Sequence, residues 1–208
     1  MGSFTRQSGR ALVGGATLLI LLNVILTPLL PVGDGDAATR ASTVYLFRLS
    51  GAVVSALLLL FGSIGVYIVH LRHRRSGRFG GVAFAVLFLG QALLVALEWS
   101  NVFILRPLAQ IAPAALDQVG QATLLVVGSA GTAGLFALGW LLVSACLLLN
   151  RAAAGWIPLA IITGLVASVA LAVSPLGPNG AIVGTVVFGV GLIGLGRGVI
   201  ERAAWLDA

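Results

Sequence analysis

The sequence contains no lysine and little charge of either sign. All 12 of its basic residues other than histidine are arginine, 6 residues are acidic, and charged residues make up 9% of the 208 residues. The absence of lysine excludes chemistry that needs a lysine amine, such as Schiff-base formation or the phosphate-binding lysine of a P-loop. Soluble globular domains carry charge on about a quarter of their residues. The scarcity of charge therefore excludes an ordinary soluble domain.

Cysteine and histidine are almost absent as well. Cys146 is the only cysteine and lies in an apolar stretch, which excludes a disulfide framework and a thiolate metal cluster. His70 and His73 stand among arginines at the end of an apolar run, which favours contacts at the membrane surface over ligation of a transmembrane haem. We therefore expect no metal ion and no cofactor.

Long apolar runs dominate what is present. Hydrophobic residues make up 59% of the chain and the mean hydropathy is +1.11. A membrane core of about 30 Å needs roughly 20 apolar helical residues. Six stretches come close to or meet that length, at about 11–32, 49–71, 79–105, 121–149, 156–174 and 181–200. The sequence predicts an all-α, polytopic transmembrane bundle of six helices, with residues 1–208 forming a single transmembrane domain.

The arginines predict the orientation. Nine of them flank alternate loops on one side of the predicted bundle, while Arg40, Arg48 and Arg106 lie on the other side. Positive residues accumulate on the cytoplasmic side of membrane proteins, so we expect both termini in the cytoplasm. The arginines that set this orientation also account for the net charge of +6. We therefore expect membrane lipids rather than nucleic acid as partners.

Glu98 is the most informative residue, because a carboxylate inside a transmembrane segment is costly unless it is paired, hydrated or protonated. Counting about 1.5 Å per residue from Arg78 places it roughly 30 Å along the third predicted helix, toward the outer face. Arg48 opens the second helix, which should run antiparallel to the third. We therefore expect an ion pair between Arg48 and Glu98.

Other polar residues are predicted at matching depths. Gln91 shares a helix face with Glu98, and Asn101 follows Glu98 by three residues. Asn23 and Gln91 are each 13 residues from an inner-flank arginine, which predicts an amide hydrogen bond between them. The candidate ligand-binding residues of this outer polar cavity are Asn23, Arg48, Gln91, Glu98, Asn101 and Arg106.

Two interpretations of this cluster stay open. It can be a site for a small molecule, a lipid headgroup or a proton. It can equally be a structural ion pair with amide contacts that fix the register of the helices.

Glycines form a second pattern. They recur three or four residues apart, as at Gly62 and Gly65, at Gly128 and Gly131, and through 189–198. Small residues at this spacing let helices approach closely. We expect close helix packing, and the same faces offer a surface for a homo-oligomer or a partner membrane protein.

Enzyme motifs are incomplete. Residues 128–131 are similar to an intramembrane serine hydrolase site, but no histidine lies inside a predicted helix to act as base. Asp34 and Asp36 faintly resemble a phospholipid headgroup transferase signature, whose further aspartates are missing from the next helix. We therefore identify no catalytic residue and favour a non-enzymatic protein.

Two stretches resemble a bacterial family of six-helix membrane proteins of unknown function. One comprises residues 35–39 and 46–49, and the other runs from Gly139 through Arg151 to 156–159, with residues 150–152 departing from the turn usual in that family. The resemblance covers about two thirds of the chain. It implies a six-helix bundle in the bacterial plasma (inner) membrane and supplies no catalytic residues.

Three functions follow from these observations. The first is a non-enzymatic membrane protein that binds a lipid, a small amphipathic ligand or a partner protein. The second is a small transporter or proton-coupled carrier in which Glu98 titrates. The third is an intramembrane enzyme acting on a lipid, with Glu98 as general acid or base.

Overall fold

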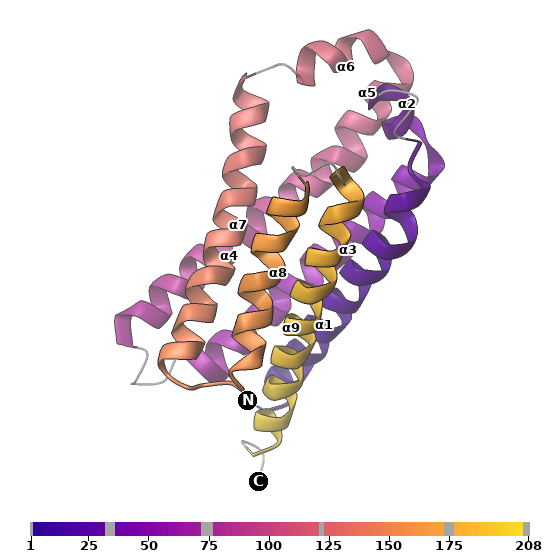
Figure 1. Ribbon diagram of the computed structural model, residues 1–208. Helices are drawn as coiled ribbons and strands as arrows, with labels where there is room; N and C mark the ends of the chain where they lie inside the picture. Colours follow the sequence, from indigo (N-terminus) through magenta and orange to yellow (C-terminus); the bar gives the residue numbers. More distant parts are fainter. Residues whose placement is uncertain (1, 32–35, 72–76, 121–122, 173–176, 206–208) are drawn as a thin grey trace.

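The computed structural model describes residues 2–31, 36–71, 77–120, 123–172 and 177–205, which are helical for most of their length and contain no strand. The long helices are α1 (Gly2–Leu21), α3 (Thr43–Val66), α4 (Gly77–Ser100), α7 (Thr123–Leu149), α8 (Trp156–Ala172) and α9 (Gly177–Trp205). The short helices α2 (Asp36–Ala41), α5 (Arg106–Ile111) and α6 (Pro113–Gly120) lie together at one end (Figure 1). The predicted all-α class is confirmed.

Several helices continue with altered hydrogen bonding at their ends. α1 passes into a π-helical turn over Leu22–Leu26 and a 3₁₀ turn over Thr27–Leu29, and α3 ends in a π-helical turn over Tyr67–Leu71. A third π-helical turn, Asn101–Leu105, joins α4 to α5. Such turns insert a residue into the regular helix and rotate the side chains that follow.

The observed helices extend beyond the apolar runs used to predict them. The first begins at Gly2 rather than at 11, and the last reaches Trp205 rather than 200. Hydropathy misses these extensions because both contain charged residues, and the first is also rich in small and polar residues, of which Gly2, Thr5, Ser8 and Gly9 are buried. The predicted helix ends at 32, 121 and 174, together with Asp34, Arg72, His73, Arg74 and Arg75, lie outside the described residues.

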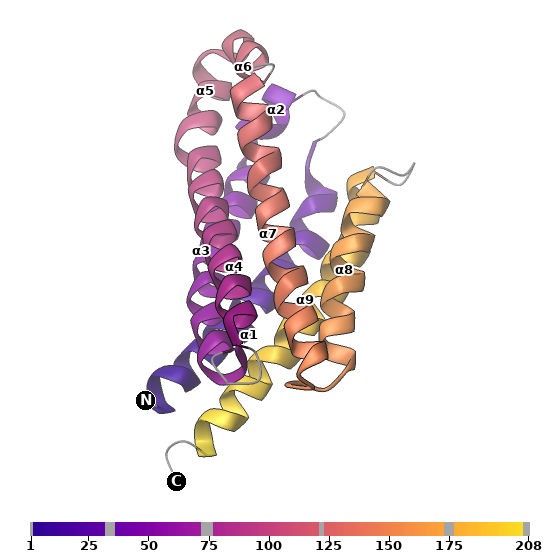
Figure 2. The ribbon, with the colours of Figure 1, turned by 90° about the vertical axis from the view of Figure 1, so that its left-hand side faces the viewer.

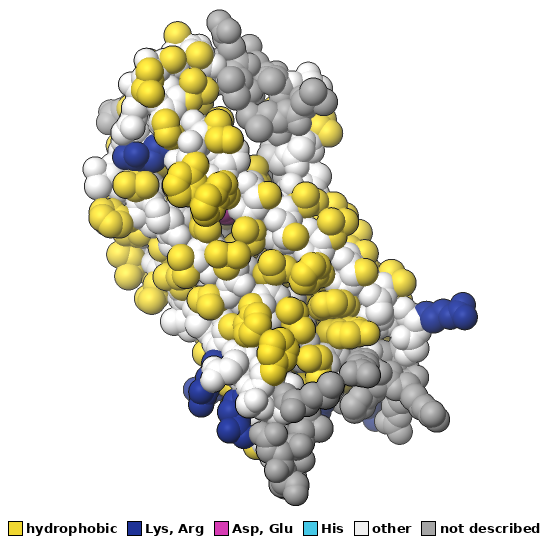
Figure 3. Space-filling model, turned by 180° about the vertical axis from the view of Figure 1, so that it is seen from behind, with side chains coloured by type: hydrophobic (Ala, Val, Ile, Leu, Met, Phe, Trp, Pro, Cys, Tyr) yellow, Lys and Arg dark blue, Asp and Glu magenta, His cyan; other side chains and the backbone are white. Residues whose placement is uncertain are grey.

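Within the described ranges, five helices are long and apolar enough to cross a membrane. They are Gly2–Leu29, Thr43–Leu71, Gly77–Ile111, Val126–Leu149 and Gly180–Ala204, and the apolar part of α8, Trp156–Leu171, is shorter. Large apolar side chains also cover much of the outer surface (Figure 3). A water-soluble monomer rarely exposes apolar patches of this extent. These features indicate a membrane-embedded protein.

The six long helices pack as a closed ring. Each contacts its neighbours in the order α1, α3, α4, α7, α8 and α9, and α9 packs again on α1. Both termini lie at the same end of the molecule, and α2, α5 and α6 cover the opposite end (Figures 1 and 2). We call these the terminus end and the cap end.

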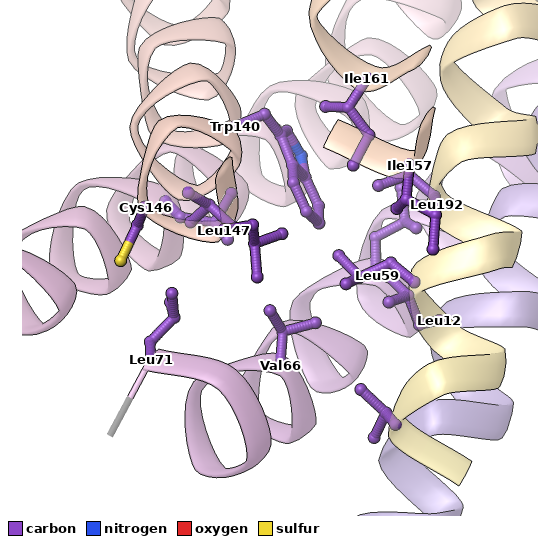
Figure 4. Close-up of a cluster of buried hydrophobic side chains, with 14 of the residues drawn as sticks. Leu12, Leu59, Val66, Leu71, Trp140, Cys146, Leu147, Ile157, Ile161 and Leu192 are labelled. Carbon is purple, nitrogen blue, oxygen red and sulfur yellow. The ribbon is translucent and has the colours of Figure 1, made fainter. Parts of the chain in front are cut away.

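The core is an apolar cluster to which all six long helices contribute. Trp140 of α7 is fully buried and meets Phe188 of α9 edge-to-face, with ring centroids 5.9 Å apart. Around it lie Leu12, Leu59, Leu147, Ile157, Ile161 and Leu192 (Figure 4). This core sits below the cap end and leaves the polar residues of that end outside it.

Glycine packing is confirmed at most of the predicted positions. An added Cβ at Gly90 of α4 would lie 2.6 Å from the backbone nitrogen of Phe136 in α7, so only glycine allows this approach. Gly128, Gly131 and Gly134 of α7 differ, because a Cβ there would meet nothing within 4 Å. Close helix packing therefore explains Gly90 but does not explain Gly128, Gly131 and Gly134.

Candidate functional site

The start of α3 carries Arg48 to the cap end. Ser42 caps this helix, since its hydroxyl accepts a hydrogen bond from the backbone nitrogen of Tyr45 at 3.2 Å. The same hydroxyl donates to the carbonyl of Thr39 in α2 at 2.8 Å. The first turn of α3 is therefore tied to the cap, and Arg48 follows in the second turn.

The irregular end of α1 supplies the groups that meet Arg48. Asn23 lies in the π-helical turn, and Thr27 begins the 3₁₀ turn that contains Pro28. Proline has no amide hydrogen to donate, which favours the end of regular helix here. The Asn23 amide nitrogen donates to the carbonyl of Leu19 at 2.9 Å, which orients its oxygen outward from the turn.

Arg48 is held by these two residues. Its Nε donates to Thr27 Oγ1 at 3.0 Å, and its NH2 group donates to Asn23 Oδ1 at 3.3 Å. Among the described residues no direct ion pair joins Arg48 to Glu98. The predicted direct ion pair is not formed, because the guanidinium is engaged by the Thr27 hydroxyl and the Asn23 amide oxygen, and Arg48 acts on Glu98 through its charge.

Glu98 lies near the end of α4 and is half-buried. Its carboxylate interacts with the Asn101 side chain and with the charge of Arg48. Its Oε2 atom is buried and has no hydrogen-bond partner among the described residues. Asn23, Thr27, Arg48, Glu98 and Asn101 form what we call the cap-end polar cluster. It brings together four of the six residues predicted to bind a ligand.

Gln91 does not join this cluster. It is fully buried, and neither atom of its amide group has a hydrogen-bond partner within the described ranges. The predicted hydrogen bond between Asn23 and Gln91 is wrong, since the Asn23 amide is used by Leu19 and Arg48. A buried amide without a partner costs about 1–3 kcal/mol, so Gln91 is a destabilising feature of the interior.

Arg106 begins α5 and is half-buried, and its Nε atom has no hydrogen-bond partner in the described part of the chain. Apolar groups surround this region on both sides. Leu49, Val53 and Val102 form one small buried cluster, and Leu105, Ala109 and Leu116 form another beneath the cap. Charged groups interact more strongly in such a low-dielectric setting than in water.

The cap-end polar cluster presents several kinds of polar group. It offers a carboxylate oxygen without a donor, an amide and a fixed guanidinium, but no nucleophile with an adjacent base. Within the described residues, no group of three histidine, cysteine or acidic side chains is placed to hold a metal ion. The arrangement is suited to polar contact with a ligand hydroxyl, amine or phosphate.

Sequence reasoning missed the role of His70 at the terminus end. We expected it to lie at the membrane surface, but it is buried, with 3% of its surface exposed. Its Nδ1 atom lies 3.0 Å from the carbonyl oxygen of Ala152 and 3.0 Å from NH1 of Arg202. These partners are 82 and 132 residues away in sequence, so no local pattern reports them.

Comparisons with protein-family models, curated proteins and solved structures found no match to this chain. The resemblance to a bacterial six-helix family therefore stays a prediction.

Proposed function

We propose that the protein is a non-enzymatic membrane protein that binds a lipid or another small amphipathic molecule at the cap-end polar cluster. The supporting observation is the buried Oε2 atom of Glu98, which has no donor among the described residues. Buried polar atoms are nearly always hydrogen-bonded. A hydroxyl or amine of a ligand would supply the donor.

The surroundings of Glu98 suit a ligand with an apolar part. The rings of Trp99 and Phe103 contact each other with centroids 4.3 Å apart and planes tilted by 36°, and both side chains are more than half exposed, at 54% and 56%. Large aromatic side chains next to a polar group are typical of sites that take amphipathic molecules.

We extend the proposal to the placement in the membrane. The protein would cross the plasma membrane of a bacterium six times, with α8 as the shortest span and both termini in the cytoplasm. Its support is that six of the described arginines belong to segments toward the terminus end, which are the starts of α1 and α4, the α7–α8 loop and the last part of α9, and three belong to α2, the start of α3 and α5 toward the cap end (Figure 1). The first group is Arg6, Arg10, Arg78, Arg151, Arg197 and Arg202, and the second is Arg40, Arg48 and Arg106. A positive cytoplasmic side fits the first group.

Native mass spectrometry in nanodiscs that contain the lipids of the source membrane tests the binding function. Wild type is compared with Glu98→Gln, with Arg78→Gln as the control because Arg78 is exposed at the opposite end, at the start of α4. We expect a discrete bound species that is lost in Glu98→Gln and kept in Arg78→Gln. Equal retention in both variants, or a bare protein in all three samples, would overturn the proposal.

A proton-coupled carrier is the second candidate. It is favoured by the π-helical turns Leu22–Leu26 and Asn101–Leu105, which flank the cap-end polar cluster, since such turns frequently mark functional sites in helices. Glu98 would then be the group that takes up and releases the proton. Proteoliposomes with an internal pH dye should lose proton flux in Glu98→Gln, and normal flux in that variant would contradict the carrier.

A further inference from the structure

A cleft of about 440 Å³ opens at the terminus end, far from the cap-end polar cluster. It lies between α9, the start of α8, the end of α3 and the loop that precedes α8. Four of its lining residues have side chains that ionise or carry charge: His70, Arg197, Glu201 and Arg202. Nothing in the function proposed above uses this cleft.

One glycine of α9, Gly198, makes room for the cleft. Residues at spacings of three and four lie on one helix face, and Gly194, Arg197, Gly198 and Glu201 follow that spacing along the cleft wall. A Cβ at Gly198 would meet only His70 Nε2, at 4.0 Å, which is an ordinary contact distance. Gly198 is therefore not needed for helix packing, and its lack of a side chain leaves the cleft open.

The loop between α7 and α8 positions the opposite wall. Its turn is a Schellman motif, in which the backbone nitrogen of Ala152 bonds to the carbonyl of Leu147 at 3.0 Å and that of Arg151 to Leu148 at 3.2 Å. Arg151 accordingly has a positive φ of 50°. The turn directs the carbonyl of Ala152 toward His70, at 3.0 Å from its Nδ1 atom.

His70 holds Arg202 in a defined position. Its Nδ1 atom can either donate to Ala152 or accept from Arg202 NH1, because one ring nitrogen does not do both at once. When it accepts from Arg202, the imidazole positions that guanidinium at the cleft wall. The guanidiniums of Arg202 and Arg197 then line the same space.

The remaining walls are apolar. Trp156, Ile157, Val190 and Ile193 line the cleft beside the charged residues, and Trp156 is 54% exposed. With histidine neutral, two arginines against Glu201 leave a net positive lining. Arginine is the side chain best suited to bind phosphate oxygens through two parallel hydrogen bonds.

We infer that this cleft binds an anionic phosphate group through Arg197 and Arg202, with His70 positioning the Arg202 guanidinium. Two sources share this chemistry: the headgroup of an anionic phospholipid, whose chains would lie along the apolar walls, and a soluble phosphate. The inference is independent of the cap-end polar cluster.

Native mass spectrometry of the full chain in mild detergent, titrated with dioctanoyl phosphatidylglycerol, tests the inference. We expect saturable binding of the lipid, with weaker binding of dioctanoyl phosphatidylcholine. Competition with inorganic phosphate distinguishes the sources: no displacement points to a lipid headgroup, and displacement points to a soluble phosphate. The inference would be overturned if neither dioctanoyl phosphatidylglycerol nor inorganic phosphate bound.

Variants with matched controls locate the bound phosphate. Arg197→Gln should weaken binding roughly tenfold through the loss of a charged hydrogen bond, whereas Arg78→Gln, an exposed arginine outside the cleft, should not change it. Gly198→Leu should block binding, and Gly134→Leu, where there is equally free space, should not. Glu201→Gln should tighten binding, since it removes the one negative side chain from the lining.

Thermal unfolding of each variant separates lost binding from lost folding. Glu98→Gln should keep full binding at the cleft, so failure of one site does not imply failure of the other. Equal weakening by Arg197→Gln and Arg78→Gln would indicate unspecific attraction to the positive surface and would overturn the inference.

Discussion

The polar side chains at the cap end differ in how many hydrogen-bond partners they have. Arg48 has two acceptors from α1, whereas Glu98 Oε2 and Arg106 Nε have no hydrogen-bond partner among the described residues. The shared level of Asn23, Arg48 and Glu98 along the bundle was predictable from the sequence, because each residue advances a helix by about 1.5 Å. The pairing was not, since the π-helical turn Leu22–Leu26 rotates Asn23 away from the direction that regular helical spacing predicts.

For Gln91 we can predict whether a substitution raises or lowers the free energy of unfolding. Replacing a buried amide that lacks partners by an apolar side chain of similar length removes its desolvation cost, so Gln91→Met should raise the free energy of unfolding by about 1–2 kcal/mol. Unfolding in detergent, followed by tryptophan fluorescence, measures this change. Gln110→Met is the control, because Gln110 is exposed on α5 and its replacement should leave stability unchanged. A less stable Gln91→Met protein would show that the amide has a partner in the native protein.

Helices as elements were predicted more reliably than their ends. The apolar runs located the six long helices because length and hydropathy suffice for that purpose. The short cap helices α2 and α6 and the π-helical turns escaped prediction. Their hydrogen-bond pattern depends on packing between distant segments, such as the bond from Thr39 Oγ1 to the carbonyl of Pro31 at 2.9 Å.

The contact between α4 and α7 yields the second prediction. Gly90→Ala would put a methyl group 2.6 Å from the Phe136 nitrogen and 2.7 Å from the Leu135 oxygen, so α7 must shift. We expect a loss of about 1–3 kcal/mol in the free energy of unfolding. Gly134→Ala, on the open side of α7, should cause no loss, because alanine favours helix and meets nothing within 4 Å. Equal losses in thermal unfolding of the two variants would contradict this packing.

The whole molecule has its two termini at one end, which leads to the third prediction. Cys146 is 1% exposed, so the native protein should react little with a maleimide. Single cysteines at the exposed positions Ser3, Ala204 and Ala114 then report the two ends. With six spans, a membrane-impermeant maleimide should label Ser3→Cys and Ala204→Cys from the same side and Ala114→Cys from the other.

Labelling of Ser3→Cys and Ala204→Cys from opposite sides would show that an odd number of helices cross the membrane. The short α8 would then be the helix that does not cross. The six-span proposal would be wrong in that case, although the cleft at the terminus end would keep its lining.

The ring of helices has a consequence for biosynthesis. A ribosome makes α1 first and α9 last, yet α9 is the helix that packs between α8 and α1. The face of α1 around Gly9 packs closely on α9, since a Cβ at Gly9 would lie 2.7 Å from the side chain of Ile200. Until α9 leaves the ribosome, this face lacks that neighbour. The ring therefore stays open until the last helix is made, and a chain truncated before α9 would keep the contacts from α1 through α8 but lack the helix that closes the ring.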